Sequence, residues 1–234
     1  MPRIARVLCP GLPHHVTQRG NRRGTVFFTD RDRKAYLRWL QEYTRKHAIE
    51  VLAYCLMTNH VHLVVVPATR HGLHRALRPL HMRYAQRVNR ARDWKGHLWQ
   101  GRYFASALDE AYCWAAIRYV ERNPVRAGMI AKAEGYPWSS AAAHCGYRSD
   151  PVLTTDASWR RRCEAVGNWS AWLAGNDEQE RLDTLRRHAN RGLPCGSPAF
   201  VEMLEKTTGR SLRYRAQGRQ GSKGTHPFKG VRPL

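Results

Sequence analysis

The chain has 234 residues, with 40 Lys and Arg against 18 Asp and Glu, and its formal net charge at pH 7 is +22. A surplus of this size lies mostly on the surface and attracts polyanions, so nucleic acid is the expected partner. The sequence shows neither an apolar run of the roughly 20 residues that cross a bilayer nor a secretory signal, which argues against a membrane partner. Its six cysteines are scattered and form no CxxC pair, which favours a cytoplasmic chain with reduced thiols.

The hydrophobic pattern predicts alternating strands and helices over the first 150 residues. The first expected strand is 14–19, which residues 25–29 extend or pair with. A hairpin of 49–57 and 60–66 follows, and residues 97–107 are expected to form another strand or an extended segment. The expected helices are 31–47, capped by Asp30, a basic amphipathic helix at 71–91, and 110–122, capped by Asp109 and stopped by Pro124. This order predicts an α+β fold, a ferredoxin-like antiparallel sheet with helices on one face.

The alternation of predicted strands and helices ends near residue 150. We expect a first domain over 1–150 whose closing edge is 125–150, then a helical C-terminal region over 151–208 and a basic, flexible tail over 209–234. The tail holds seven Lys or Arg and no acidic residue, which suits either a phosphate backbone or a merely solubilising role.

Two histidines one residue apart, His60 and His62, open an apolar, β-branched run. Strand side chains alternate faces, so both imidazoles are expected side by side on one face, where they form half of a metal site. Imidazole serves Mg²⁺ or Mn²⁺ when oxygen ligands complete the shell. The alternative is a histidine that only fills a gap in the core. Neutral imidazoles are required as ligands, so activity is expected to fall below about pH 6.

A metal on two histidines polarises a phosphate but supplies no nucleophile, so the nucleophile must come from elsewhere. On the helix over 110–122, Tyr119 shares a face with Asn123 one turn on, and Arg118 and Arg122 flank that face and could hold phosphates. A phenol has a pKa near 10, well below that of an alcohol, and a phosphotyrosine diester stores bond energy without a nucleotide cofactor. Ordinary helix packing is the alternative role for Tyr119. Tyr84 is the rival nucleophile, but it lacks a polar partner one turn on.

Together these motifs resemble the REP-associated tyrosine transposases, relatives of the IS200-like single-strand transposases and of the HUH endonucleases. The resemblance is carried by residues 57–62 (MTNHVH), 98–103 (LWQGRY), Tyr119 with 123–128 (NPVRAG), and 136–140 (YPWSS). It implies a ferredoxin-like catalytic domain with the histidine pair on a central strand. It also implies Mg²⁺ or Mn²⁺ held by His60, His62 and Asn123, although many relatives have the longer Gln at the third position.

The resemblance further implies that Tyr119 cleaves single-stranded hairpin (REP-like) DNA through a 5′-phosphotyrosine link, in a monomer or homodimer. Arginines in the early turn and on the basic helix are candidates for hairpin phosphates; with the two that flank Tyr119, the set is Arg19, Arg22, Arg23, Arg83, Arg87, Arg118 and Arg122. Trp99 and Tyr103 suit either base stacking or the core. The alternatives are a non-catalytic DNA- or RNA-binding protein that keeps the fold, and a plasmid relaxase or replication initiator.

Overall fold

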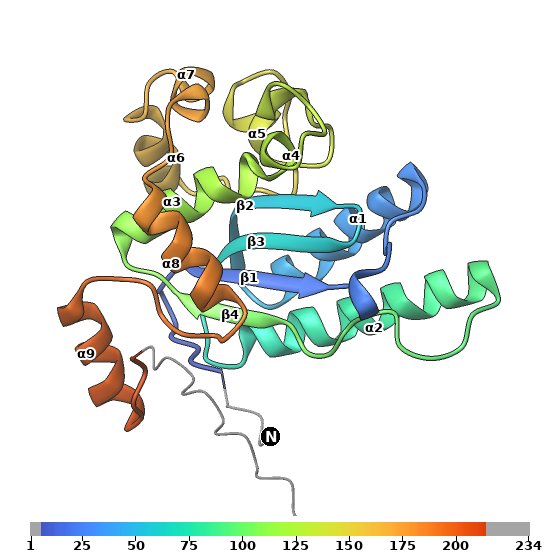
Figure 1. Ribbon diagram of the computed structural model, residues 1–234, viewed down its shortest axis with the longest axis horizontal. Coiled ribbons are helices and arrows are strands. Elements are labelled where there is room, and N and C mark those ends of the chain that lie inside the picture. The colour runs from blue at the N-terminus through green and yellow to red at the C-terminus, as the bar shows by residue number, and fades with distance from the viewer. Residues whose placement is uncertain (1–5, 214–234) are drawn as a thin grey trace, which may run out of the picture.

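The computed structural model describes residues 6–213 as a four-stranded antiparallel sheet covered by helices (Figure 1). The strands are β1 (His14–Arg19), β2 (Ile49–Met57), β3 (His60–Pro67) and β4 (Phe104–Ala107), in the order β2-β3-β1-β4. This is the predicted ferredoxin-like arrangement, and it places β3 and β1 in the middle of the sheet.

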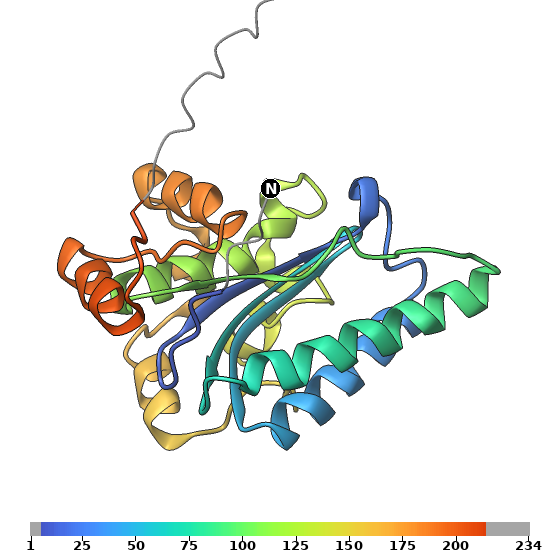
Figure 2. The same cartoon turned by 90° about the horizontal axis from the view of Figure 1, so that it is seen from below.

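Helices α1 (Asp30–Lys46) and α2 (Gly72–Arg92) lie on one face of the sheet, as Figure 2 shows from below. Their apolar stripes pack on side chains of β1 and β3, including Val16, Leu63 and Val65, in one core cluster. Thr29, rather than the predicted Asp30, caps α1, and it forms a capping box with Asp32.

The opposite face is covered too, by α3 (Glu110–Glu121), so the expectation of helices on one face only is wrong. Cys55, Val64 and other residues of β2 and β3 that point this way pack against Ile117 and Val120 of α3. The physical reason is visible in β2, whose run is apolar at nearly every position, since a strand buried on both faces needs no polar alternation.

Two expected strands are shorter or absent. Residues 25–29 form no strand, although the N–H groups of Val26 and Phe27 both donate to the Thr58 carbonyl. Of the segment 97–107 only 104–107 is a strand, and Trp99 makes a single bridge with Gly20. Buried side chains anchor both segments without a continuous backbone ladder.

The segment over 125–150 lies against the β2 edge of the sheet. The Leu56 N–H donates to Trp138 O at 2.8 Å, and the Ser140 N–H donates to Tyr54 O at 3.0 Å. The short elements here are α4 (Asn123–Arg126), η2 (Ala133–Gly135) and α5 (Ala141–His144). The free edge of β2 is thereby covered.

The C-terminal region is helical, as predicted. Its helices are α6 (Ala157–Glu164), α7 (Trp169–Ala174), α8 (Gln179–Ala189) and α9 (Pro198–Thr208). Helix α8 packs on α3 and on the β4 side of the sheet. Most of the predicted basic tail, residues 214–234, lies outside the described residues. Across 6–213 none of the helices combines the length and apolar character that a membrane span requires.

Candidate active site

The predicted histidine pair and the predicted tyrosine meet on the α3 face of the sheet. His60 and His62 project from β3 with ring centroids 4.8 Å apart. The Tyr119 ring on α3 stands edge-on to His62, with centroids 5.6 Å apart. The structure therefore brings together, within one chain, three residues that the sequence had assigned to one site.

A third histidine, His15 on β1, completes the group. Its Nε2 shares a hydrogen bond of 2.9 Å with His62 Nδ1, its ring stacks on His62 at 5.1 Å, and it lies 5.8 Å from the Tyr119 ring. The sequence analysis missed this residue. His15 lies two residues before Thr17, which the register pairs with His62, so both histidines share a face once that register is known.

The nitrogen atoms that remain open fit a divalent metal. His60 Nδ1–H donates to Asn59 Oδ1 at 2.6 Å, which leaves the lone pair of Nε2 free. If His62 Nδ1–H donates to His15, its Nε2 is free as well; such outer hydrogen bonds orient histidine ligands in metal sites. Among the described residues no group of three His, Cys, Asp or Glu suits a metal, so oxygen ligands must complete the shell.

Asn123 begins α4 one turn after Tyr119, and its side-chain Nδ2 is buried without a hydrogen-bond partner. The unpaired atom is an N–H donor, which suits a phosphate oxygen or water, whereas only the Oδ1 atom of this amide could bind a metal ion. The donor set of two imidazoles and an amide oxygen is compatible with Mg²⁺ or Mn²⁺ whose remaining ligands are phosphate and water.

Burial keeps the site histidines neutral. It lowers the pKa of His60 and of His15 to about 4, and it lowers the pKa of His62 well below its usual value, with the neighbouring His60 adding to the effect. Neutral imidazole is the form that binds a metal. The expected loss of activity near pH 6 therefore moves to lower pH in this environment.

Three arginines, Arg118, Arg122 and Arg126, lie on or just after the helix that carries Tyr119. The Arg126 guanidinium lies 4.3 Å from the Tyr119 ring centroid and donates to the Tyr119 carbonyl. Arg118 and Arg122, the predicted phosphate ligands, form ion pairs with Asp177 at 3.2 and 3.3 Å. Sequence reasoning missed Asp177 because it lies more than 50 residues along the chain.

The other predicted DNA-binding arginines fall into two groups. Arg19 pairs with His60 in the register of β1 and β3, and Arg22 and Arg23 are exposed in the turn that follows, η1 (Asn21–Arg23). Arg83 and Arg87 lie on α2, across the sheet from the histidines, and pair with Glu42 at 3.2 Å and Asp32 at 3.6 Å. The structure thus does not bring the α2 arginines to the histidine face.

The rival aromatic residues belong to the core. Tyr84 is fully buried on the α1–α2 side, and its hydroxyl donates to Val26 O at 2.7 Å. The Trp99 indole donates to His81 O at 2.9 Å, and Tyr103 is buried in the same cluster. None of the three is free to attack DNA or to stack a base.

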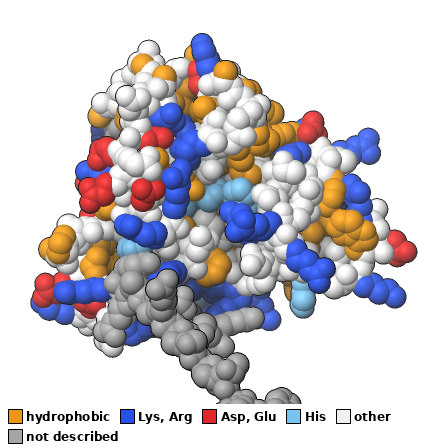
Figure 3. All heavy atoms as spheres, in the orientation of Figure 1, with side chains coloured by type: hydrophobic (Ala, Val, Ile, Leu, Met, Phe, Trp, Pro, Cys, Tyr) orange, Lys and Arg blue, Asp and Glu red, His pale blue; other side chains and the backbone are white. Residues whose placement is uncertain are grey.

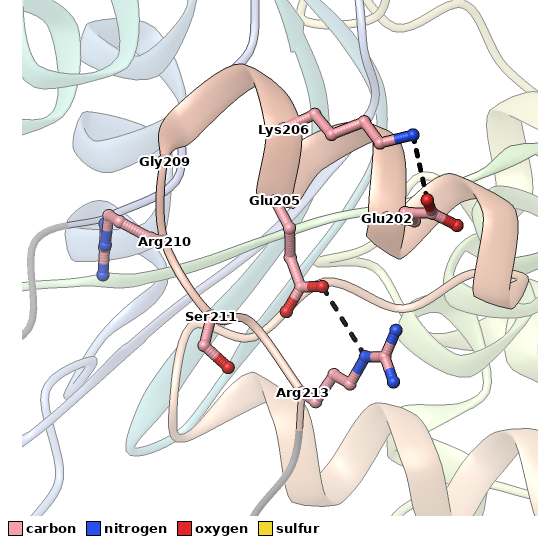
Figure 4. A pocket seen from close by; sticks show the side chains of 7 residues that line it. All are labelled: Glu202, Glu205, Lys206, Gly209, Arg210, Ser211 and Arg213. Atoms are coloured by element: carbon pink, nitrogen blue, oxygen red, sulfur yellow. Dashed lines mark ion pairs between the residues drawn. The ribbon is translucent and has the colours of Figure 1, made fainter.

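Histidine atoms reach the surface in the middle of the face shown in Figure 3, with Lys and Arg side chains to either side. A separate hollow lies beside α9 (Figure 4), where Lys206 pairs with Glu202 at 2.9 Å and Arg213 with Glu205 at 3.6 Å. The residues that line it include none of the predicted catalytic or metal-binding residues. The basic face with the histidines is the candidate active site.

Comparison with known proteins supports the fold. A solved structure of a REP-associated tyrosine transposase bound to a REP hairpin matches with a TM-score of 0.53 and 18% identity, over 67% of this chain and 93% of that one. A putative transposase from Deinococcus radiodurans R1 matches with a TM-score of 0.37 and 20% identity, over 52% of this chain and 97% of that one. No curated protein matches the sequence. Residues 10–123 match the family model described as "Transposase IS200 like", so this part of the chain is an IS200-like transposase domain.

Proposed function

We propose that the protein is a metal-dependent endonuclease and strand transferase of single-stranded hairpin DNA that works through a 5′-phosphotyrosine intermediate. The observation that carries the proposal is the packing of Tyr119 against His62 and His15, with His60 beside them. A phenol next to two open imidazole nitrogens is the arrangement needed for nucleophilic attack on a phosphate held by a metal.

In the proposed reaction the Tyr119 oxygen attacks the scissile phosphorus. The new P–O bond to tyrosine forms as the P–O3′ bond breaks, the phenol proton passes to water, and the departing 3′ oxygen takes up a proton. A 3′-hydroxyl from the same or another strand can then attack the phosphotyrosine and restore a phosphodiester, with Tyr119 as the leaving group.

The remaining site residues would hold the metal ion and orient one another. His60, His62 and Asn123 would hold Mg²⁺ or Mn²⁺, which when bound polarises a non-bridging oxygen of the phosphate. His15 orients His62 through their shared hydrogen bond. One chain supplies His60, His62 and Tyr119 together, so the proposal requires no second subunit.

The substrate class is supported by the charge of the chain and by the related structure. The net charge of +22 suits a polyanion, and the structure with a similar fold holds a REP hairpin. Arg19, Arg22 and Arg23 lie near the histidine end of the sheet and are the best placed to contact hairpin phosphates.

The experiment mixes the protein with 3′-labelled single-stranded hairpin DNA, with and without Mn²⁺, and resolves the products on a denaturing protein gel. The 3′ label is needed because a 5′-phosphotyrosine keeps the downstream fragment on the protein. We expect a labelled protein band that requires Mn²⁺. A gel shift on the same DNA without any covalent band would instead support the alternative of a non-catalytic nucleic-acid-binding protein.

A further inference from the structure

Three arginines beside Tyr119 converge on a single carboxylate. Arg118, Arg122 and Arg126 lie 3.2, 3.3 and 3.5 Å from the oxygens of Asp177, in the loop between α7 and α8. The four side chains are only 13–17% exposed. Arg118 and Arg122 also donate to the Gly175 carbonyl of that loop. We call Arg118, Arg122 and Arg126 the arginine cluster.

The charges of the arginine cluster do not balance. One carboxylate faces three guanidinium groups, and the neighbouring acid, Glu178, is paired with Arg181 at 3.0 Å. Like charges brought together away from water repel each other strongly, so the arrangement favours a further anion. Arg118 Nε and Arg126 Nη1 face Asp177 at 3.2 and 3.5 Å as ion pairs, but neither forms a hydrogen bond, so the single carboxylate does not satisfy the donors of the cluster.

The position of the arginine cluster indicates which anion it takes. Arg126 lies against the Tyr119 ring and donates to its backbone carbonyl, so the cluster adjoins the proposed nucleophile. Guanidinium forks match the paired oxygens of carboxylate and phosphate groups alike, so a site that holds the Asp177 carboxylate also suits a phosphodiester. A strand whose scissile phosphate lies at Tyr119 carries its neighbouring phosphates one nucleotide away.

We infer that the arginine cluster binds a phosphodiester of the DNA strand next to the scissile one, and that Asp177 occupies this site until DNA replaces it. The inference rests on the proposed function for the role of Tyr119, but it concerns binding and not cleavage. The Asp177 carboxylate stands in for two phosphate oxygens, so removing its charge while keeping its shape favours the incoming strand.

The test measures affinity for a fluorescent single-stranded oligonucleotide by anisotropy, without metal and in a Tyr119→Phe background so that no cleavage intervenes. We expect Asp177→Asn to tighten binding about tenfold, which corresponds to about 1.4 kcal/mol. The matched control is Asp183→Asn, which removes the same charge from an exposed pair with Arg186 on α8, and we expect less than a twofold change. Equal effects of the two substitutions would overturn the inference.

A second variant guards against a loss of folding in Asp177→Asn. Arg122→Gln keeps Asp177 in place, and we expect it to weaken binding and to reduce the slope of log K against log salt by about 0.7, as for one lost phosphate contact on a single strand. An unchanged slope would contradict the inference.

The source of the phosphate is tested with inorganic phosphate. If phosphate raises the thermal midpoint of Asp177→Asn while its oligonucleotide affinity stays at the level of Asp183→Asn, the site takes free phosphate and the DNA assignment is wrong. Because neither metal nor Tyr119 takes part, a positive binding result together with a negative covalent assay would refute the proposed function alone.

Discussion

Two tyrosine-to-phenylalanine substitutions separate chemistry from stability. Tyr119→Phe removes the proposed nucleophile, and we expect it to abolish the covalent protein–DNA band while DNA binding and folding remain. Tyr84→Phe removes the hydroxyl of the rival tyrosine, and we expect a full covalent band from a less stable protein.

The magnitudes follow from the hydrogen bonds of the two hydroxyls. Within residues 6–213 the Tyr119 hydroxyl forms no hydrogen bond, and the ring is only half-buried, so its loss should change the free energy of unfolding by less than about 0.5 kcal/mol. Tyr84 is fully buried and donates to Val26 O at 2.7 Å, so its loss leaves a buried carbonyl unpaired at a cost of about 1–3 kcal/mol.

Both variants are assayed by denaturant unfolding and by the covalent gel with Mn²⁺. A cost of about 1–3 kcal/mol for Tyr84→Phe corresponds to a drop of a few degrees in the thermal midpoint for each kcal/mol in a chain of this size. A labelled band that persists in Tyr119→Phe would refute the assignment of the nucleophile. Loss of the band in Tyr84→Phe at full stability would transfer that role to Tyr84.

Three further predictions concern buried polar groups. His60→Ala should abolish Mn²⁺ binding measured by calorimetry. His15→Ala should weaken that binding about 10- to 100-fold, because His62 loses the hydrogen bond that orients it. Unchanged Mn²⁺ affinity in both variants would refute the metal site. Glu121 is buried and accepts three side-chain hydrogen bonds. Glu121→Ala should therefore lower the free energy of unfolding, measured by urea denaturation, by about 3 kcal/mol or more. A loss below about 1 kcal/mol would contradict this prediction. Burial lowers the pKa of His14 to about 4 and of His81 to about 3, so below pH 6.5 the unfolded chain binds more protons than the folded protein. Each residue should therefore remove about 3–5 kcal/mol from the free energy of unfolding as the pH falls from 6.5 to 3. Unfolding measured across that range should show this loss, and a flat profile would exclude it.

Local patterns in the sequence were sufficient to predict most elements of the fold. The spacing of apolar residues gave α1, α2 and α3 to within one or two residues, and the hairpin of β2 and β3 follows from two apolar runs around a short break. For segments 25–29 and 97–103 the prediction of a strand was wrong, because irregular packing and not a strand ladder buries their apolar residues. Burial alone makes a segment apolar, whether or not a neighbouring strand lies within reach of its backbone.

The sequence was sufficient to predict the site residues that lie close together along the chain. His60 and His62 share one strand, and Asn123 begins α4 one turn after Tyr119 of α3, so their spacing was informative. His15 required the register of β1 against β3, and Asp177 required the packing of a distant loop on α3. Contacts between elements depend on tertiary structure, and the sequence of each element does not reveal them.

The turn after β1 has a consequence for how the chain balances stability against charge. Arg22 and Arg23 have φ values of 51° and 60°, a left-handed conformation that costs a non-glycine residue about 1 kcal/mol or more. The turn is tied to the β2–β3 connection, since Asn59 donates to Arg23 O at 2.9 Å beside His60. Glycine at both positions would make a more stable protein. Two arginines there instead hold positive charge at the histidine end of the sheet, at the expense of folding free energy.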